Sequence, residues 1–156
     1  MKIHFVLLAQ TVLLASCATP YQQDGFRGGF DDVQLSENAW KVSFTGNAYT
    51  SSEKAANYSL LRCADICLDN GYSYFVIRDA NQSTSTSVHT TPITSYSTPT
   101  GYGGYTTNNY GGNVSMQSRP SASNVILCYK SKPKEVGMVY DARFLKESLG
   151  SKLGVQ

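Results

Sequence analysis

Histidine and cysteine carry much of the reactive side-chain chemistry of proteins, and this chain has two histidines and four cysteines. His4 lies in the apolar N-terminal run, and His89 lies in a segment of low sequence complexity. A Ser-His or Cys-His nucleophile pair therefore lacks a base on a rigid element, where catalytic geometry is usually held. The adjacent carboxylates Asp31 and Asp32 point apart and cannot flank a scissile bond as in a glycosidase. We therefore predict no catalytic residues, no enzyme activity and no cofactor, and the sequence identifies no ligand-binding site.

Cys17 stands at the end of a stretch that has the features of an export signal. A single positive charge, Lys2, precedes the apolar run 3–15, and this order followed by small residues indicates a secretory signal peptide. The run is shorter than the roughly 20 residues of a membrane-spanning helix. Its end, Leu14-Ala15-Ser16-Cys17, resembles the bacterial lipoprotein box, in which small residues precede an acylated cysteine. The sequence thus predicts a signal peptide over 1–16 and a palmitate-bearing lipid anchor on Cys17. The alternative is an ordinary signal peptide in which Cys17 is incidental.

Acylation of Cys17 would decide where the mature protein lies. A lipoprotein cysteine carries two or three acyl chains, and each buried CH₂ contributes about 0.8 kcal/mol, so the anchor holds without a transmembrane helix. The residue after Cys17 is Ala18 and not Asp. Resemblance to lipoprotein sorting in Gram-negative bacteria therefore favours the outer membrane, with the domain facing the periplasm.

Residues 17–34 are predicted to be the lipidated N-terminus and a tether, because they are rich in Gly, Gln and Asp. Tyr21, Phe26 and Phe30 are unusual in a linker and are candidates for docking on the domain. The domain itself is predicted to extend over 35–156.

The first part of the domain predicts a strand followed by a long helix. Apolar and polar residues alternate over 40–45, the period-two pattern of a half-buried strand. Thr50-Ser-Ser-Glu53 has the form of a capping box and predicts a helix over 51–70 that stops at Gly71. The predicted buried stripe consists of Ala56, Leu60, Cys63, Ala64 and Cys67, widened by Leu61 and Leu68, with Arg62, Asp65 and Asp69 on the solvent side.

Two more strands and a second helix complete the predicted fold. The aromatic and β-branched runs 72–78 and 125–129 are predicted as central strands, and a short helix is predicted from Asp141 to before Gly150, burying Ala142, Leu145 and Leu149. We therefore predict a small α+β fold of two layers. It has a mainly antiparallel sheet packed by one long helix and a short C-terminal helix, with a long low-complexity insertion.

The insertion, residues 81–118, contains no Asp, Glu, Lys or Arg and consists largely of Ser, Thr, Gly, Asn and Tyr. Loops longer than about 12–15 residues are usually functional or disordered. A disordered insertion is the simplest interpretation. A long β-arm is a second one, because Thr-rich alternation over 83–91 suits strands. A binding surface built from Tyr96, Tyr102, Tyr105 and Tyr110 is a third, since Tyr beside Gly and Ser gives adaptable contacts.

After lipidation of Cys17, three thiols remain, at Cys63, Cys67 and Cys128. They predict no metal site, because a zinc centre would need a fourth ligand. Two cysteines four apart on a helix are poorly placed to bond each other. If 125–129 pairs antiparallel with 72–78, Cys128 lies at the end of the sheet nearest Cys67. We therefore expect a Cys67–Cys128 disulfide with Cys63 buried and reduced. Three buried free thiols are the alternative.

The charge of the chain argues against nucleic-acid binding. Loss of the signal removes Lys2 alone, which leaves 12 basic and 11 acidic residues. The single basic cluster, Lys130, Lys132 and Lys134, is flanked by Glu135 and is better explained as a solvated strand end.

Several segments together resemble a family of small proteobacterial outer-membrane lipoproteins. They are Cys17-Ala-Thr-Pro-Tyr-Gln22, Val42-Ser-Phe-Thr-Gly-Asn47 with Thr50, Leu60-Leu-Arg-Cys-Ala64 and Gly71-Tyr-Ser-Tyr-Phe75. The chain departs from the family pattern at Cys63 and Asp65, where Ala and Glu are usual. The resemblance implies location and architecture, and brings no activity or catalytic residues.

These observations predict a non-enzymatic, membrane-anchored lipoprotein of the bacterial envelope that acts through protein–protein contacts. Its expected partners are the lipid bilayer, through acylated Cys17, and envelope or secretion-complex proteins, with neither nucleic acid nor a small-molecule substrate. An accessory subunit of a secretion or envelope-spanning complex is the alternative, and a cell-wall glycan-binding module or a hydrolase is a third.

Overall fold

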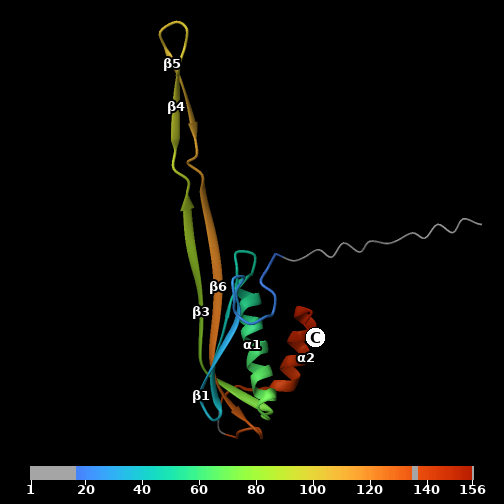
Figure 1. Cartoon of the computed structure of the whole chain (residues 1–156). Coiled ribbons are helices and arrows are strands. Elements are labelled where there is room, and N and C mark those ends of the chain that lie inside the picture. The colour runs from blue at the N-terminus through green and yellow to red at the C-terminus, as the bar shows by residue number, and fades with distance from the viewer. Residues whose placement is uncertain (1–16, 135–136, 156) are drawn as a thin grey trace, which may run out of the picture.

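The computed structural model describes residues 17–134 and 137–155 of the chain (Figure 1). The predicted signal peptide, residues 1–16, which includes the first three residues of the predicted lipoprotein box, lies outside the described residues, as does Glu135. The elements in chain order are β1 (Gly29–Ser36), β2 (Ala39–Thr45), α1 (Ser52–Asp69), β3 (Tyr74–Thr90), β4 (Thr94–Pro99), β5 (Tyr105–Tyr110), β6 (Val114–Tyr129), β7 (Val139–Asp141) and α2 (Ala142–Leu153).

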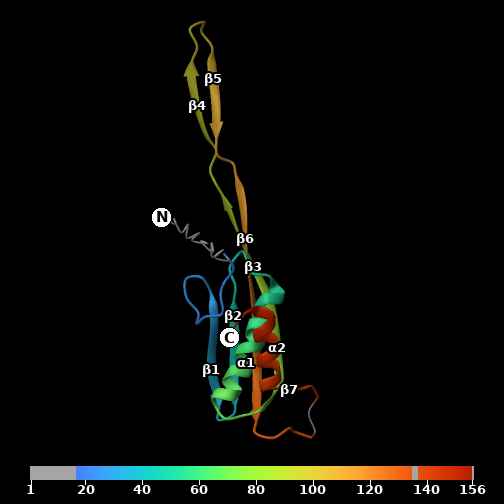
Figure 2. The same ribbon diagram turned by 90° about the vertical axis from the view of Figure 1, so that its right-hand side faces the viewer.

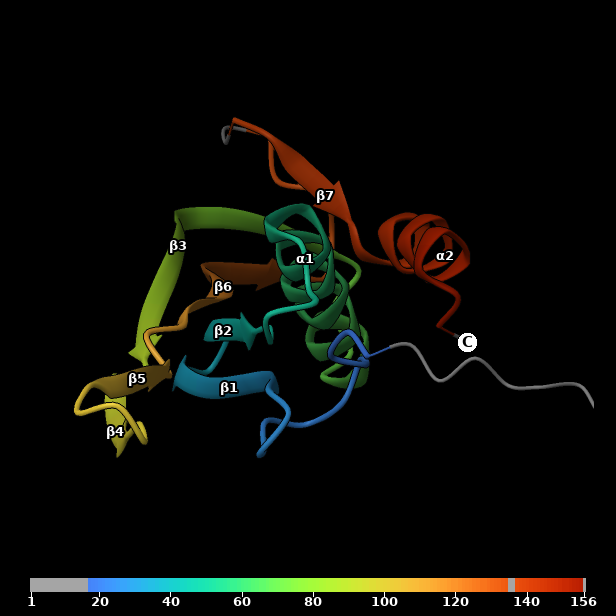
Figure 3. The ribbon, with the colours of Figure 1, turned by 90° about the horizontal axis from the view of Figure 1, so that it is seen from above.

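Five strands form an antiparallel sheet in the order β1-β2-β6-β3-β7. Helix α1 packs on one face of this sheet, and α2 packs on α1 (Figures 2 and 3). The predicted α+β fold with a mainly antiparallel sheet, one long helix and a short C-terminal helix is confirmed. Its core lies between the sheet and α1, where Val42, Phe44 and Phe75 are fully buried. Each such side chain contributes about 1.5–3 kcal/mol.

Helix α1 begins one residue later than the capping box predicted. The N-cap is Ser51, whose hydroxyl accepts a hydrogen bond from the Lys54 N–H at 3.1 Å. Thr50 is instead buried, and its hydroxyl accepts a hydrogen bond from the Thr19 N–H at 3.0 Å. Thr50 therefore fixes the N-terminal segment of the protein and does not cap the helix.

The buried face of α1 is wider than the predicted stripe, because α1 is covered on two sides. Cys63, Ala64 and Cys67 face the sheet as predicted, whereas Ala56 and Leu60 are only half-buried. The buried residues of α1 are Ala55, Tyr58, Ser59, Leu61, Cys63, Ala64, Ile66 and Cys67. The prediction that Arg62 and Asp65 face solvent is wrong, because α2 and the N-terminal segment pack over that side.

Helix α2 starts where predicted but continues past Gly150. Asp141 is the N-cap and accepts a hydrogen bond from the Phe144 N–H at 3.0 Å. A Cβ on Gly150 would lie 2.9 Å from the Val155 carbonyl oxygen. The glycine therefore allows the chain to fold back against the helix and does not end it. The helix stops at Gly154, which has the left-handed conformation of a C-terminal cap.

The prediction of a tether over 17–34 is wrong, because this segment folds onto the domain. Thr19 is fully buried, and the strand β1 pairs with β2 from Gly29↔Thr45 onward. The rings of Tyr21 and Phe30 lie 4.9 Å apart and join the apolar cluster around Phe44. Phe26 remains fully exposed. Two of the three aromatic candidates for docking thus pack on the domain, which begins close to Cys17.

Candidate functional site

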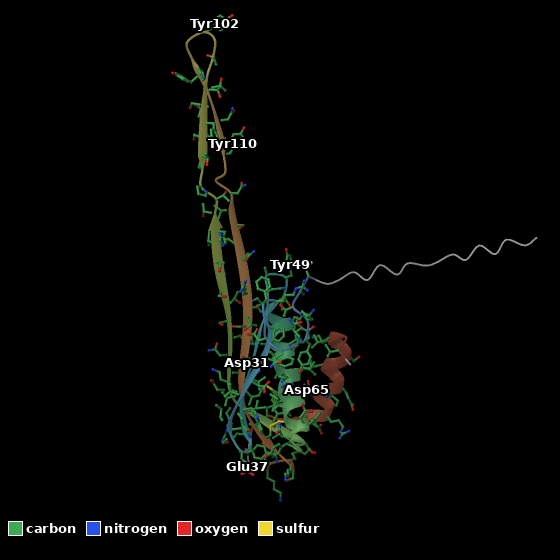
Figure 4. All side chains as sticks on the ribbon, viewed as in Figure 1. Asp31, Glu37, Tyr49, Asp65, Tyr102 and Tyr110 are labelled. Carbon is green, nitrogen blue, oxygen red and sulfur yellow. A yellow bond between two sulfur atoms is a disulfide. The ribbon has the colours of Figure 1, made fainter. Side chains whose placement is uncertain are left out.

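The most conspicuous feature of the molecule is an arm, residues 81–118, that projects far beyond the domain (Figures 1 and 4). β3 and β6 continue past the sheet as a two-stranded ladder whose last pair is Thr90↔Val114. A second ladder, β4 with β5, carries the arm outward to a turn at Tyr102. Every residue from Arg78 to Arg119 is exposed. The β-arm interpretation of the insertion therefore fits the structure, and the disordered interpretation does not.

Local sequence explains the joint between the two ladders. Gly111 and Gly112 have positive φ angles of 101° and 74°, a conformation that side chains other than glycine rarely adopt. A Cβ on Gly111 would also collide with the Pro92 carbonyl oxygen. The hydrogen bond from the Thr91 N–H to the Asn113 carbonyl, at 2.9 Å, closes the first ladder just before this joint.

The two faces of the first ladder differ in polarity. One face carries the larger and β-branched side chains, Thr84, Thr86, Val88, Thr90, Val114 and Met116. The opposite face carries the more polar ones, Ser83, Ser85, Ser87, His89, Ser115 and Gln117. On the second ladder, the rings of Tyr96 and Tyr110 lie 6.3 Å apart, and Tyr102 at the turn is fully exposed. Of the four tyrosines predicted as a binding surface, two therefore contact each other.

Cys17 lies beside the turn that contacts the base of the arm. Its carbonyl oxygen accepts a hydrogen bond from the Asn47 side-chain amide at 2.8 Å, while the neighbouring Gly46 N–H donates to the Pro120 carbonyl at the base of the arm. The Cys17 side chain is exposed, and Tyr49 nearby is 73% exposed (Figure 4). The predicted attachment site and the base of the arm are therefore held by the same turn.

The residues that hold Cys17 in place were missed by the sequence prediction. Thr19 donates from its hydroxyl to the Arg27 carbonyl and accepts from the Asn47 N–H, both at 2.8 Å. Asn47 also accepts a hydrogen bond from the Thr50 hydroxyl at 3.0 Å. The available signal is the run Gly46-Asn47 with Thr50, of which the sequence analysis interprets Thr50 alone, as a helix cap.

A polar cluster fixes the segment after Cys17 against the helices. Tyr21 donates from its hydroxyl to Asp65 Oδ2 at 2.5 Å, and Lys146 Nζ lies 2.7 Å from Asp65 Oδ1. Burial and the hydrogen bond to Asp65 raise the pKa of Tyr21 far above its usual value, so the hydroxyl stays protonated. Arg62 reaches Asp32 on β1 at 2.8 Å. This cluster connects β1, α1 and α2. The buried Asp65 Oδ1 atom lies against the Lys146 ammonium as an ion pair and has no other partner among the described residues.

The cysteines are arranged as the sequence favoured. Cys67 and Cys128 form a disulfide with their Cα atoms 5.8 Å apart, and the register Phe75↔Cys128 places Cys128 at the end of the sheet where α1 ends. Cys63 is free and fully buried. Burial raises the pKa of the Cys63 thiol, so it stays neutral, and a neutral thiol is a poor nucleophile.

Within residues 17–134 and 137–155, no three His, Cys, Asp or Glu side chains gather closely enough to hold a metal ion. No helix in that part of the chain is both long and apolar enough to cross a membrane.

A groove follows α2, lined by Leu68, Arg143, Lys146 and Glu147. His89 is exposed on the arm, far from the groove.

Comparisons with protein-family models, with curated proteins and with solved structures found no match to this chain.

Proposed function

We propose that the protein is a non-enzymatic lipoprotein of the bacterial envelope, anchored through Cys17 in the outer membrane and facing the periplasm, whose arm makes protein–protein contacts. The observation that carries the proposal is the arm itself. Its 38 residues lack charge and are all exposed. Because ordering a residue costs about 1–2 kcal/mol in backbone entropy, an ordered segment that buries nothing in its own domain is best explained by contacts with another molecule.

The composition of the arm also supports a contact surface for proteins. Thr and Ser are its commonest residues, followed by Gly, Tyr and Asn, and Tyr beside Ser, Gly and Asn makes adaptable contacts at low entropic cost. An isolated two-stranded hairpin is at best marginally stable in water. A partner that adds a strand or covers a face would therefore stabilise the arm.

Two features support an exported and anchored protein. The Cys67–Cys128 disulfide is of a kind that forms and persists in oxidising compartments such as the periplasm. Cys17 is exposed beside the base of the arm, with the exposed ring of Tyr49 nearby, and aromatic side chains are favoured at membrane interfaces. A lipid on Cys17 would therefore tether the domain to the membrane close to the base of the arm.

The second candidate, an accessory subunit of an envelope-spanning complex, is favoured by the reach of the arm. From residue 81 to the turn at Tyr102, fully extended chain covers roughly 70 Å at about 3.3 Å per residue. Such a length would let an anchored domain contact a subunit well away from its own membrane attachment point.

We expect Cys17→Ser to abolish lipidation and membrane association. Cells expressing the full chain are grown with an alkyne-tagged palmitate analogue, and the protein is recovered from separated membrane and soluble fractions. The wild type should carry the label and fractionate with outer membranes, whereas the variant should be unlabelled. Cys63→Ser is the matched control, because it removes a buried thiol and leaves Cys17 in place. Label retained in Cys17→Ser would contradict the anchor.

A further inference from the structure

The arm has two open edges of similar length. Inside the domain, β2 covers one side of β6 from Leu127 to Ser121, and β7 covers one side of β3 from Tyr74 to Val76. Beyond these residues β3 and β6 pair only with each other. The open edges of a sheet present unpaired N–H and C=O groups, which readily pair with a further strand.

The ladder identifies which backbone groups face outward. The Thr91 N–H donates to the Asn113 carbonyl, so this pair is of the hydrogen-bonded type. Pairs alternate in an antiparallel ladder, so Thr86↔Ser118 is of the other type and directs its backbone groups away from the partner strand. Pro120 fits the same alternation, because its carbonyl accepts a hydrogen bond from Gly46 on the side away from β3.

Charged residues stop at the base of the arm. Arg78 and Asp79 on β3 and Arg119 on β6 lie there, and residues 81–118 contain no charged side chain. Natural proteins protect open edges with charged residues, especially Lys, with Pro and with bulges. The bulge of β3 between Ile77 and Asp79 is likewise at the base. Both edges beyond it lack charged side chains, and two identical arms would not repel each other.

We infer that the arms of separate copies of this chain pair edge to edge, with the β3 edge of one copy against the β6 edge of the next. The inference deepens the proposed function and rests on it, because anchoring through Cys17 gathers the copies on one membrane surface, where arms that point the same way can meet. Since β3 and β6 run in opposite directions within each copy, similarly directed arms meet as antiparallel strands at every contact. Each copy then offers one edge of each kind, so the contact repeats from copy to copy.

Sedimentation of the full lipidated protein in mild detergent tests the pairing. Thr86→Pro with Ser118→Pro changes one residue on each edge and removes N–H groups that face outward, a position at which strands tolerate proline. Thr86→Ala with Ser118→Ala is the matched control, because it keeps both N–H groups. The wild type and the alanine variant should sediment as multimers. The proline variant should sediment as a monomer with an unchanged melting temperature.

A second variant replaces residues 86–118 by Asn-Gly and should also be monomeric, whatever the prolines do to local strand geometry. A wild type that is monomeric although it carries the palmitate label would overturn the pairing and leave the anchoring intact. Multimers of unchanged size in both the proline and the shortened variants would also overturn the pairing. A monomeric wild type without the label would instead overturn the proposed anchoring.

Discussion

The double substitution Cys67→Ala and Cys128→Ala is expected to lower the free energy of unfolding of the oxidised protein by roughly 4 kcal/mol. The two cysteines are 61 residues apart, and in the chain-entropy model a cross-link closing a loop of that size restricts the unfolded chain by about this amount. Small domains have only about 5–15 kcal/mol of net stability. Loss of the disulfide should therefore bring the domain close to its folding limit.

Urea unfolding followed by circular dichroism measures this effect, with Cys63→Ala as the control. Cys63 is equally buried in the same cluster but forms no disulfide, so its truncation isolates the cost of losing a small buried group. Reduction of the wild type should reproduce most of the effect of the double variant. A change below about 1 kcal/mol in both the reduced wild type and the double variant would mean that the disulfide does not stabilise this domain.

Replacing residues 86–118 by Asn-Gly is expected to leave the melting temperature of the domain within a few degrees of the wild type. The new turn connects Ser85 to Arg119, a pair of the hydrogen-bonded type, which a two-residue type I′ turn closes. All removed residues are exposed, so no core contact is lost. Shortening a flexible loop changes closure entropy by only about 0.6 kcal/mol for each halving of its length. The same replacement should abolish assembly completely.

Differential scanning calorimetry of the shortened and complete chains tests the independence of the domain from the arm. Phe44→Ala serves as the reference for a change that does affect the core, at about 3–5 kcal/mol. If the shortened chain melts as early as Phe44→Ala does, the arm is part of the folding unit.

Most of the fold could be predicted because it depends on local periodicity. The alternation at Trp40, Val42 and Phe44 follows the pleat of β2, and Cys63 with Cys67 follows the turn of α1. The strand β1 could not be predicted this way. Its sequence around Asp31 is polar and preceded by glycines, and it forms a strand because β2 offers an unpaired edge beside it.

Tertiary contacts also determine which residues fix the segment that follows Cys17 against the domain. Thr50 has the sequence features of an N-cap, yet Ser51 takes that role because Thr50 is occupied by Thr19. Asp65 lies opposite the core stripe of α1 in sequence, but Tyr21 and Lys146 cover it from segments distant in the chain. No spacing rule along the helix contains that information.

Whether the arm is disordered or forms strands could not be predicted from its sequence, for a different reason. Ser-, Thr- and Gly-rich segments without charge are compatible both with disorder and with strands. The pairing that separates the two joins residues as distant as Gln82 and Ala122, and it continues the register set inside the domain by Phe75↔Cys128. The core strands therefore set the register of the arm.

Photo-cross-linking in intact cells tests most directly whether the arm is the contact surface of this protein. A photoreactive phenylalanine analogue is placed at Ser87 on the arm or at Ser148, an exposed residue of α2, and the adducts are detected through a tag. Ser87 should give a discrete adduct with the mass of two copies, and Ser148 should give none. An adduct of Ser87 with another protein would retain the arm as a contact surface and overturn the pairing of copies. Adducts from Ser148 with none from Ser87 would contradict the arm as the contact surface.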